Sequence, residues 1–284
     1  MHIESVAIIG VGLLGGSLGL ALKERGLAGV VRGVGRRRES LSKALEAGTI
    51  DSAHLDLASG VQDADLIVIC TPASQVVPLL DVLRDIALPS AIVTDVASTK
   101  ASICAHANAT WSVPRRFIGS HPMTGSEKFG PEHAFAHLYE NAVVVLEKSR
   151  HVDNHARNLV RNLWESVGAR IVEVEPVEHD AIVARTSHVS HVAAAALATI
   201  AVRQGPNAQP LSGRGFRDFT RIAASRPEVW RDICLTNRAA VLSGLDEFTE
   251  ELRQIRAAID RGDGLSIEAF FKAGRAAREE IVGT

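Results

Sequence analysis

The chain has 284 residues, 46% of them hydrophobic and 23% charged, which is typical of a globular protein long enough for two domains. Lysine and arginine together number 31 against 33 aspartates and glutamates, so the net charge is −2. This balance, without a dense basic stretch, argues against nucleic acid or an anionic membrane as the main partner and suits a small acidic substrate.

The cysteines Cys70, Cys104 and Cys234 lie far apart and lack Cys-x-x-Cys spacing. Neither a disulfide framework nor a thiolate zinc site is therefore expected. The N-terminus lacks the pattern of a signal peptide, and the most apolar later stretch, residues 193–202, is too short to span a bilayer. The expected location is the cytoplasm.

Short β-rich apolar runs alternate with helix-like stretches over the first part of the chain. The runs are residues 6–9, 30–34, 66–70, 91–94, 117–119, 142–146 and 171–174. This alternation predicts a doubly wound, mostly parallel sheet. Ala-rich helical pattern follows over residues 180–203 and 228–259. A boundary at Pro176 then gives an α/β domain of residues 1–176 and a helical domain of residues 177–284.

The last predicted helix carries apolar residues at spacings of 4, 3, 4, 3 and 4, the pattern of a coiled-coil seam. These residues are Val241, Leu245, Phe248, Leu252, Ile255 and Ile259. A seam of this kind requires a second helix. Packing inside the helical domain and a dimer interface both satisfy that requirement.

The first predicted strand leads into a Gly-x-Gly-x-x-Gly turn that opens a helical pattern. Gly10 allows the tight turn, Gly12 lets a pyrophosphate approach the backbone, and Gly15 permits close packing of helix on strand. Because a second strand follows, the turn favours dinucleotide binding over a merely structural role. The candidate cofactor contacts here are Gly10, Gly12, Leu13, Leu14 and Gly15.

The position about 20 residues beyond the turn usually carries an acidic residue in NAD sites. Here it holds Gly35, followed by Arg36, Arg37 and Arg38. An arginine cluster suits a 2′-phosphate, so NADP is the expected cofactor in preference to NAD, with Arg36 and Arg37 as contacts. The alternative is that these arginines form a solvated helix start. Thr71 and Pro72, which end the strand at 66–70, are candidates to border the nicotinamide ribose.

Two further predicted strands end in polar residues at the sheet edge where ligands bind in open α/β folds. One is followed by Ser98 and the other by His121. A histidine with an ordinary pKa of about 6.5 is mostly neutral at pH 7 and can accept the proton of an alcohol that is being oxidised. Ser98 is positioned to orient that ring or the hydroxyl. The alternative for His121 is ordinary hydrogen bonding.

The helical region contributes polar residues of its own. Asp180, Ser187 and His191 project within about 40° of one another on an ideal helix, and a buried polar stripe of this kind needs partners or a ligand. The histidine pairs with i,i+4 spacing, His133/His137 and His151/His155, have no third ligand, so they are interpreted as surface residues and no metal is expected.

A glycine loop at residues 212–215 enters a helix with two arginines four residues apart, Arg217 and Arg221. Two guanidinium groups beside helix-start amides form a candidate carboxylate site. The alternative is that Asp218 satisfies Arg221 as an i,i+3 ion pair.

Taken in order, these motifs resemble the prephenate/arogenate dehydrogenase family of tyrosine biosynthesis over nearly the whole chain. They are Gly-Val-Gly-Leu-Leu-Gly-Gly-Ser-Leu at 10–18, Asp95-x-x-Ser98-x-Lys100, His121-Pro-Met-x-Gly-Ser-Glu127, His179-Asp180 with Ser187-His188-x-x-His191, and Gly215-Phe-Arg-Asp-Phe-Thr-Arg221 followed by Trp230. The resemblance implies a Rossmann-type doubly wound sheet followed by an all-helical domain that forms a homodimer. It also implies oxidative decarboxylation of prephenate or arogenate with hydride transfer to NAD(P), giving 4-hydroxyphenylpyruvate or tyrosine.

The resemblance further implies residue roles. His121 would take the hydroxyl proton with support from Ser98, and Arg221 would bind the ring carboxylate. The remaining implied contacts are Arg217, Glu127 and Asp218 at the mouth of the site, and His191 and Trp230 near the substrate side chain. Arg217 stands where some relatives have lysine, and the chain has no room for the regulatory domain of some members, so allosteric control by tyrosine through such a domain is not expected.

Nothing in the sequence separates prephenate from arogenate, which differ in a keto or amino group. The alternatives are a β-hydroxyacid or imine oxidoreductase of similar architecture, and a non-catalytic NADP-binding sensor. The first usually depends on a lysine in the helical domain, and residues 176–250 contain none. The second does not account for Ser98, His121 and Arg221 together.

Overall fold

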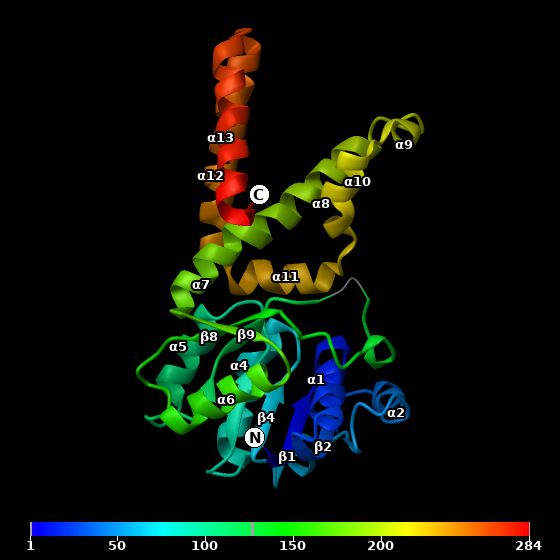
Figure 1. Cartoon of the computed structure of the whole chain (residues 1–284), viewed down its shortest axis with the longest axis vertical. Helices are drawn as coiled ribbons and strands as arrows, with labels where there is room; N and C mark the ends of the chain where they lie inside the picture. Colours follow the sequence, from blue (N-terminus) through cyan, green and yellow to red (C-terminus); the bar gives the residue numbers. More distant parts are fainter. Residues whose placement is uncertain (1, 126–127, 284) are drawn as a thin grey trace.

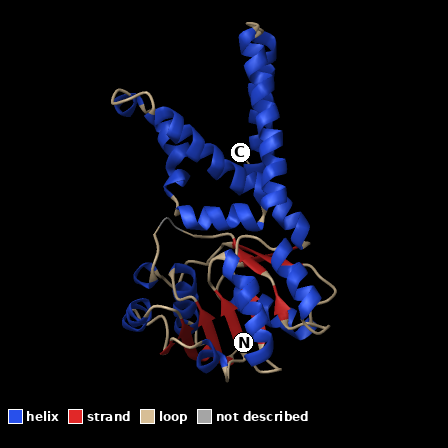
Figure 2. Ribbon diagram, turned by 180° about the vertical axis from the view of Figure 1, so that it is seen from behind, coloured by secondary structure: helices blue, strands red, loops and turns tan. Residues whose placement is uncertain are grey.

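An α/β layer and an all-helical arm are stacked one on the other (Figure 1). The structure is a computed structural model that describes residues 2–125 and 128–283. The last strand ends at Val174 and the first helix of the arm begins at Pro176. In Figure 2 the strands lie among the helices of the lower layer, while the arm consists of helices alone.

The main sheet has six parallel strands in the order β3-β2-β1-β4-β5-β6. This is the strand order of a doubly wound dinucleotide-binding fold, as predicted. The strands are β1 Ile3–Ile9, β2 Ala28–Val34, β3 Ser52–His54, β4 Leu66–Ile69, β5 Ile92–Asp95 and β6 Phe117–Ile118. Strand β3 was not predicted, because Ser-Ala-His lacks the apolar residues on which the prediction depended.

Helices cover both faces of this sheet and enclose two hydrophobic cores. The helices are α1 Leu13–Glu24, α2 Arg38–Glu46, α3 Leu57–Val61, α4 Ala73–Ile86, α5 Ala101–Thr110 and α6 Asn154–Ser166. One core joins the sheet to α1 and α6 through Leu22 and Trp164, and the other joins it to α4 and α5 through Leu80 and Ile103. Each fully buried side chain of this size contributes about 1.5–3 kcal/mol.

The predicted strands at 142–146 and 171–174 do not join the main sheet. β7 (Ser120–Pro122), β8 (Val143–Glu147) and β9 (Arg170–Val174) form a separate sheet in which β7 is antiparallel to β8. The predicted strand at 117–119 ends at Ile118, and the chain passes through Gly119 into β7. Residue patterns indicate strands but not their partners, so one sheet was predicted where two exist.

The arm contains seven α-helices among the residues that the structure describes. They are α7 Pro176–Val183, α8 Val189–Val202, α9 Ala208–Leu211, α10 Arg214–Thr220, α11 Pro227–Thr236, α12 Arg238–Asp260 and α13 Gly264–Val282. A π-helical turn, η2 (Ala184–His188), joins α7 to α8, and a 3-10 turn, η3 (Arg221–Ala224), joins α10 to α11. The predicted helix at 228–259 is broken at Asn237, and α13 was not predicted.

Helix α11 lies across the top of the α/β layer, whereas α12 and α13 form a hairpin that projects away from it (Figure 1). The predicted seam on α12 is only partly covered within the chain: Val241 is buried, but Leu252 and Ile259 are 49% and 61% exposed. Within the described residues, no helix is long and apolar enough to cross a membrane.

Candidate active site

The glycine turn between β1 and α1 has the backbone geometry that a dinucleotide requires. Gly10 has a φ of +96°, and a Cβ there would lie 2.7 Å from the Cys70 carbonyl oxygen. A Cβ at Gly15 would lie 2.3 Å from the Gly10 carbonyl oxygen, so close packing excludes any side chain. At Gly12 a Cβ would meet nothing within 4 Å, which leaves the start of α1 open to a phosphate. Leu13 and Leu14 follow, partly buried against the core.

The neighbouring strand end presents an unsatisfied polar atom. The Oγ1 atom of Thr71, directly after β4, is buried and has no hydrogen-bond partner among the described residues. Its Cγ2 atom lies 3.2 Å from where a Gly10 Cβ would be, so the hydroxyl belongs to the same cradle. A buried hydroxyl without a partner is costly, and a bound ribose or amide would satisfy it. Pro72 follows as the exposed N-cap of α4.

The predicted arginine cluster lies after β2. Arg36, Arg37 and Arg38 are all exposed, and Arg37 is the N-cap of α2. Within the described chain these arginines form no ion pair, so their charges are available to an anion. No carboxylate stands at this strand end, as the sequence indicated.

His121 lies on β7 and is only 8% exposed. Its Nδ1 atom lies 2.9 Å from Nε2 of His179, with the two rings edge to face. Burial holds the pKa of His121 well below its ordinary value, and the positive charge of Lys100 acts in the same direction. The ring is therefore neutral at pH 7, which is the state a proton acceptor needs.

The chain before His121 is held by a buried ion pair. Glu147 on β8 pairs with Arg115, and its Oε2 atom accepts hydrogen bonds from the Gly119 N–H at 2.8 Å and from the Cys104 thiol at 3.1 Å. Arg115 also donates to the carbonyl oxygen of Phe117. The passage from β6 to β7 is thus fixed on both sides. The sequence analysis missed Arg115 and Glu147, which belong to no recognisable motif.

A second buried ion pair lies at the end of β5. Asp95 pairs with Lys100 and accepts hydrogen bonds from the Ala97 N–H at 3.0 Å and the Ser120 N–H at 3.1 Å. The loop between Asp95 and Lys100 carries Ser98, which is half-buried. Among the described residues no hydrogen bond joins Ser98 to His121. Because Ser120 also binds Asp95, the structure brings both predicted residues to the end of β5, without a hydrogen bond between them.

Asp180 joins the two domains. Its carboxylate accepts hydrogen bonds from the backbone N–H groups of Lys100 at 2.7 Å and Ala101 at 2.9 Å, at the start of α5. Asn237, between α11 and α12, donates to the Asp180 carbonyl oxygen at 2.8 Å. The predicted polar stripe assumed one uniform helix. That prediction is wrong, because η2 interrupts the helix. Asp180 therefore faces α5, while His191 has a different partner.

His191 on α8 stacks on Trp230 of α11, with ring centroids 3.6 Å apart and planes at 23°. His188 meets the same indole edge to face and lies 3.3 Å from the amide nitrogen of Asn237. Burial lowers the pKa of His188 to about 4. These rings form an aromatic wall that connects α8 with α11.

The predicted arginine pair lies at the end of α10. Arg217 is within α10, whereas Arg221 begins η3. Asp218 pairs with Arg214, at 3.4 Å between Oδ2 and Nε, so the predicted alternative of an Asp218–Arg221 ion pair is wrong. Burial lowers the pKa of His191, and the charge of Arg221 contributes to that shift. Arg221 thus lies close enough to His191 to affect it electrostatically, and Glu127 lies outside the described residues.

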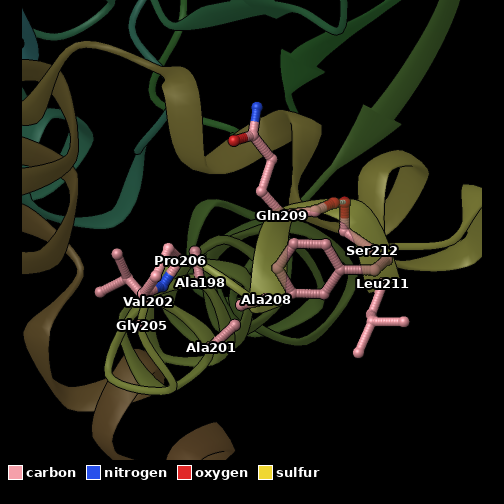
Figure 3. A pocket seen from close by; sticks show the side chains of 10 residues that line it. Ala198, Ala201, Val202, Gly205, Pro206, Ala208, Gln209, Leu211 and Ser212 are labelled. Carbon is pink, nitrogen blue, oxygen red and sulfur yellow. Dashed lines mark hydrogen bonds between the residues drawn. The ribbon is translucent and has the colours of Figure 1, made fainter.

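An apolar groove of about 710 Å³ lies away from these residues, between α8, α9 and α10 (Figure 3). Ala198, Val202, Leu211 and Phe216 are among its lining residues. It contains no titratable side chain and is not part of the site. In the described chain no group of three His, Cys, Asp or Glu residues is arranged to hold a metal ion.

A parallel sheet of this order, an open glycine turn and a buried, neutral imidazole on β7 define a dinucleotide-dependent dehydrogenase fold. Two models of one family match the chain: "Prephenate dehydrogenase, nucleotide-binding domain" over residues 18–173 and "Prephenate dehydrogenase, dimerization domain" over residues 175–273. The chain belongs to the prephenate dehydrogenase family, which confirms the predicted resemblance.

Individual relatives agree with this assignment. Prephenate dehydrogenase of Bacillus subtilis is 34% identical over 98% of this chain and 76% of its own length. The structure of prephenate dehydrogenase from A. aeolicus, in complex with hydroxyphenyl propionate and NAD+, is 32% identical with a TM-score of 0.90 over 99% of both chains. Synechocystis arogenate dehydrogenase is 31% identical with a TM-score of 0.82, over 98% of this chain and 99% of its own.

Proposed function

We propose that the protein catalyses the NAD(P)-dependent oxidative decarboxylation of prephenate, arogenate or both. The observation that carries this proposal is the neutral, buried imidazole of His121 on β7, held at the end of β5 in the same α/β domain as the open glycine turn. A bound nicotinamide supplies the hydride acceptor. The ring carboxylate leaves as carbon dioxide, and the ring becomes aromatic as 4-hydroxyphenylpyruvate or tyrosine.

The proton of the substrate hydroxyl goes to His121. A neutral imidazole at this position accepts the proton as the C–H bond breaks, which avoids a protonated ketone. Ser98, on the loop after β5, donates to or accepts from the same hydroxyl and so orients it. The two buried ion pairs hold the backbone before His121, because Glu147 accepts from the Gly119 N–H and Asp95 accepts from the Ser120 N–H.

The substrate's carboxylate is held by Arg221. Its guanidinium is exposed, acts electrostatically on His191 and forms no ion pair within the described chain. Bidentate hydrogen bonds from a guanidinium orient a carboxylate through its oxygens and leave its carbon free. The contact therefore permits loss of carbon dioxide. Stacked His191 and Trp230 border the substrate side chain. Arg217, Asp218 and Glu127 complete the polar rim in this proposal.

The cofactor is NADP in preference to NAD. Three exposed arginines without ion pairs in the described part of the chain, and no carboxylate at the end of β2, suit a 2′-phosphate. Arg36 and Arg37 are assigned to that phosphate. Gly10, Gly12, Leu13, Leu14 and Gly15 hold the pyrophosphate, and Thr71 with Pro72 borders the nicotinamide ribose.

Residues 177–284 form the dimerisation domain of a homodimer, and residues 1–176 the nucleotide-binding domain. The half-exposed seam on α12 and the apolar groove of Figure 3 are both on the arm, and a second copy of the chain covers them. Support comes from the dimerization-domain match over residues 175–273. Light scattering at micromolar concentration should give twice the 30.3 kDa chain mass, and a monomer would overturn this arrangement.

Absorbance of the reduced nicotinamide tests the reaction in four mixtures: prephenate or arogenate, each with NAD or NADP. Turnover in any mixture supports the reaction class, and the ratios assign substrate and cofactor. Absence of turnover in all four mixtures, with cofactor binding verified by calorimetry, would overturn the proposal. It would favour a β-hydroxyacid or imine oxidoreductase, or a cofactor-binding sensor.

A further inference from the structure

His121, His179 and Asp180 form a single hydrogen-bonded row. His121 Nδ1 lies 2.9 Å from His179 Nε2, and His179 Nδ1 lies 2.8 Å from Asp180 Oδ1. All three side chains are buried, with exposures of 8%, 2% and 2%. Because water does not reach these atoms, the protons on the row are distributed by the protein alone.

The carboxylate fixes the direction of every hydrogen bond in the row. Asp180 already accepts from the backbone N–H groups of Lys100 and Ala101, so it is an acceptor toward His179 as well. His179 therefore carries its proton on Nδ1. A neutral imidazole has one donor and one acceptor nitrogen, so Nε2 of His179 accepts. His121 must then donate from Nδ1, and its own Nε2 carries the lone pair.

We infer that His179 is a positioning residue that holds His121 in the Nδ1–H tautomer, so that Nε2 is free to take the substrate proton. This inference rests on the proposed reaction, in which His121 is the proton acceptor. The opposite tautomer would direct an N–H at the substrate hydroxyl, and such a ring cannot accept a proton from it. An acceptor facing Nδ1 is therefore as necessary as the neutral charge of the ring.

Through this row, the tautomer of His121 depends on how the helical arm is docked against the α/β domain. His121 belongs to the α/β domain, whereas His179 and Asp180 belong to α7 of the arm. Asp180 caps α5 of the α/β domain, and Asn237 anchors the Asp180 carbonyl from the other side. The capping bonds keep α7 against the sheet edge. The acceptor for His121 is present only while α7 is docked there.

Two amide variants of His179 separate this role from simple packing. In His179→Gln the side-chain amide reaches the position of Nε2 and can still accept from His121, whereas in His179→Asn the amide reaches only the position of Nδ1. We expect His179→Asn to lower kcat by about 10²–10⁴-fold with KM for substrate changed less than about threefold, since loss of the correct histidine tautomer has effects of this order. His179→Gln should recover at least about tenfold of that loss.

The exposed His155 supplies the matched control, because His155→Gln removes an imidazole from α6 far from the row and should leave kcat unchanged. Thermal unfolding with and without cofactor monitors the fold of each variant. Equal kcat values for His179→Asn and His179→Gln, both within about threefold of the unaltered protein, would overturn the inference.

A spectroscopic measurement tests the tautomer without any turnover. Long-range ¹H–¹⁵N NMR spectra of the ¹⁵N-histidine-labelled protein distinguish a protonated from an unprotonated ring nitrogen, and the His121→Asn variant identifies the His121 signals. We expect Nδ1 protonated and Nε2 unprotonated at pH 7.5. An Nε2–H ring would overturn the inference. If the expected tautomer is found but neither prephenate nor arogenate is turned over, the proposed function fails while the positioning role stands.

Discussion

Arg115 and Glu147 form an ion pair that has no solvent exposure on either side chain. The pair lies directly behind β7, and Glu147 also accepts from the Gly119 N–H two residues before His121. Two charges at such depth are tolerated because each satisfies the other and because backbone groups occupy their remaining positions. The buried Arg115–Glu147 ion pair therefore holds the backbone next to His121, the base of the proposed reaction.

Glu147→Gln should destabilise the fold by about 3–5 kcal/mol, since it leaves the Arg115 guanidinium buried without a counter-charge. Urea unfolding at fixed protein concentration measures the change in the free energy of unfolding. The matched control is Glu39→Gln, which breaks the exposed pair with Lys43 on α2 and should cost less than about 1 kcal/mol. Equal losses for the two variants would contradict the structural role given to Glu147.

His121→Asn should lower kcat by about 10²–10⁴-fold, the range of a general base, while KM for substrate changes little. The reason is that Asn places its amide near the position of Nδ1 but has no basic nitrogen. Steady-state kinetics with the preferred substrate and cofactor give the two constants. A change in KM alone would show that His121 binds substrate and that the proton goes elsewhere.

Arg221→Ala should act mainly on binding. Loss of a charged hydrogen-bond partner for the carboxylate costs about 1.5–3 kcal/mol, which corresponds to roughly 10–150-fold in kcat/KM. KM should carry most of that change. Arg214→Ala is the control, because Arg214 is 95% exposed and pairs with Asp218 at the surface. If both variants gave the same modest effect, α10 would attract the substrate through its net charge and not through a specific contact between Arg221 and the carboxylate.

The sequence was sufficient to predict the main sheet and the glycine turn, because strand periodicity and turn chemistry are local properties. Strand β3 was not predicted, because its three residues carry no apolar pattern. The second sheet was not predicted, because pairing of β7 with β8 joins residues about 25 positions apart, as in Ser120 with Leu146. Local patterns contain no such information.

The same limit applies to the site. His179 stands 58 positions from His121, and Glu147 stands 32 positions from Arg115, so neither contact leaves a trace in residue spacing. The polar stripe on the first helix of the arm was predicted from an ideal 100° step, and η2 breaks that phase. Type and spacing therefore predict which residues carry chemistry, whereas tertiary contacts decide their partners.

Stability should fall as pH is lowered from about 6.5 toward about 4 through the titration of His188. Its pKa is lowered to about 4 by burial, so the unfolded chain binds this proton first and is favoured as pH falls. The loss between pH 7 and pH 5 should be about 2 kcal/mol from this one group. His121 and His191 titrate in the same direction, since burial lowers the pKa of each.

The contribution of His188 is isolated by comparison with His188→Gln, measured by urea unfolding at both pH values. The variant should lose about 2 kcal/mol less than the unaltered protein over this interval. Parallel losses in the two proteins would mean that His188 remains protonated or becomes exposed in the folded state, contrary to its 1% exposure.

Arg36→Ala and Arg37→Ala should each raise KM for NADP by roughly tenfold and leave KM for NAD nearly unchanged, because only NADP carries the 2′-phosphate. The effect should weaken at high salt, since both guanidinium groups are exposed and screened. Arg203→Ala, which removes an exposed charge at the end of α8, serves as the control. A protein that prefers NAD before any substitution, or variants that weaken both cofactors equally, would assign these arginines to the solvated start of α2.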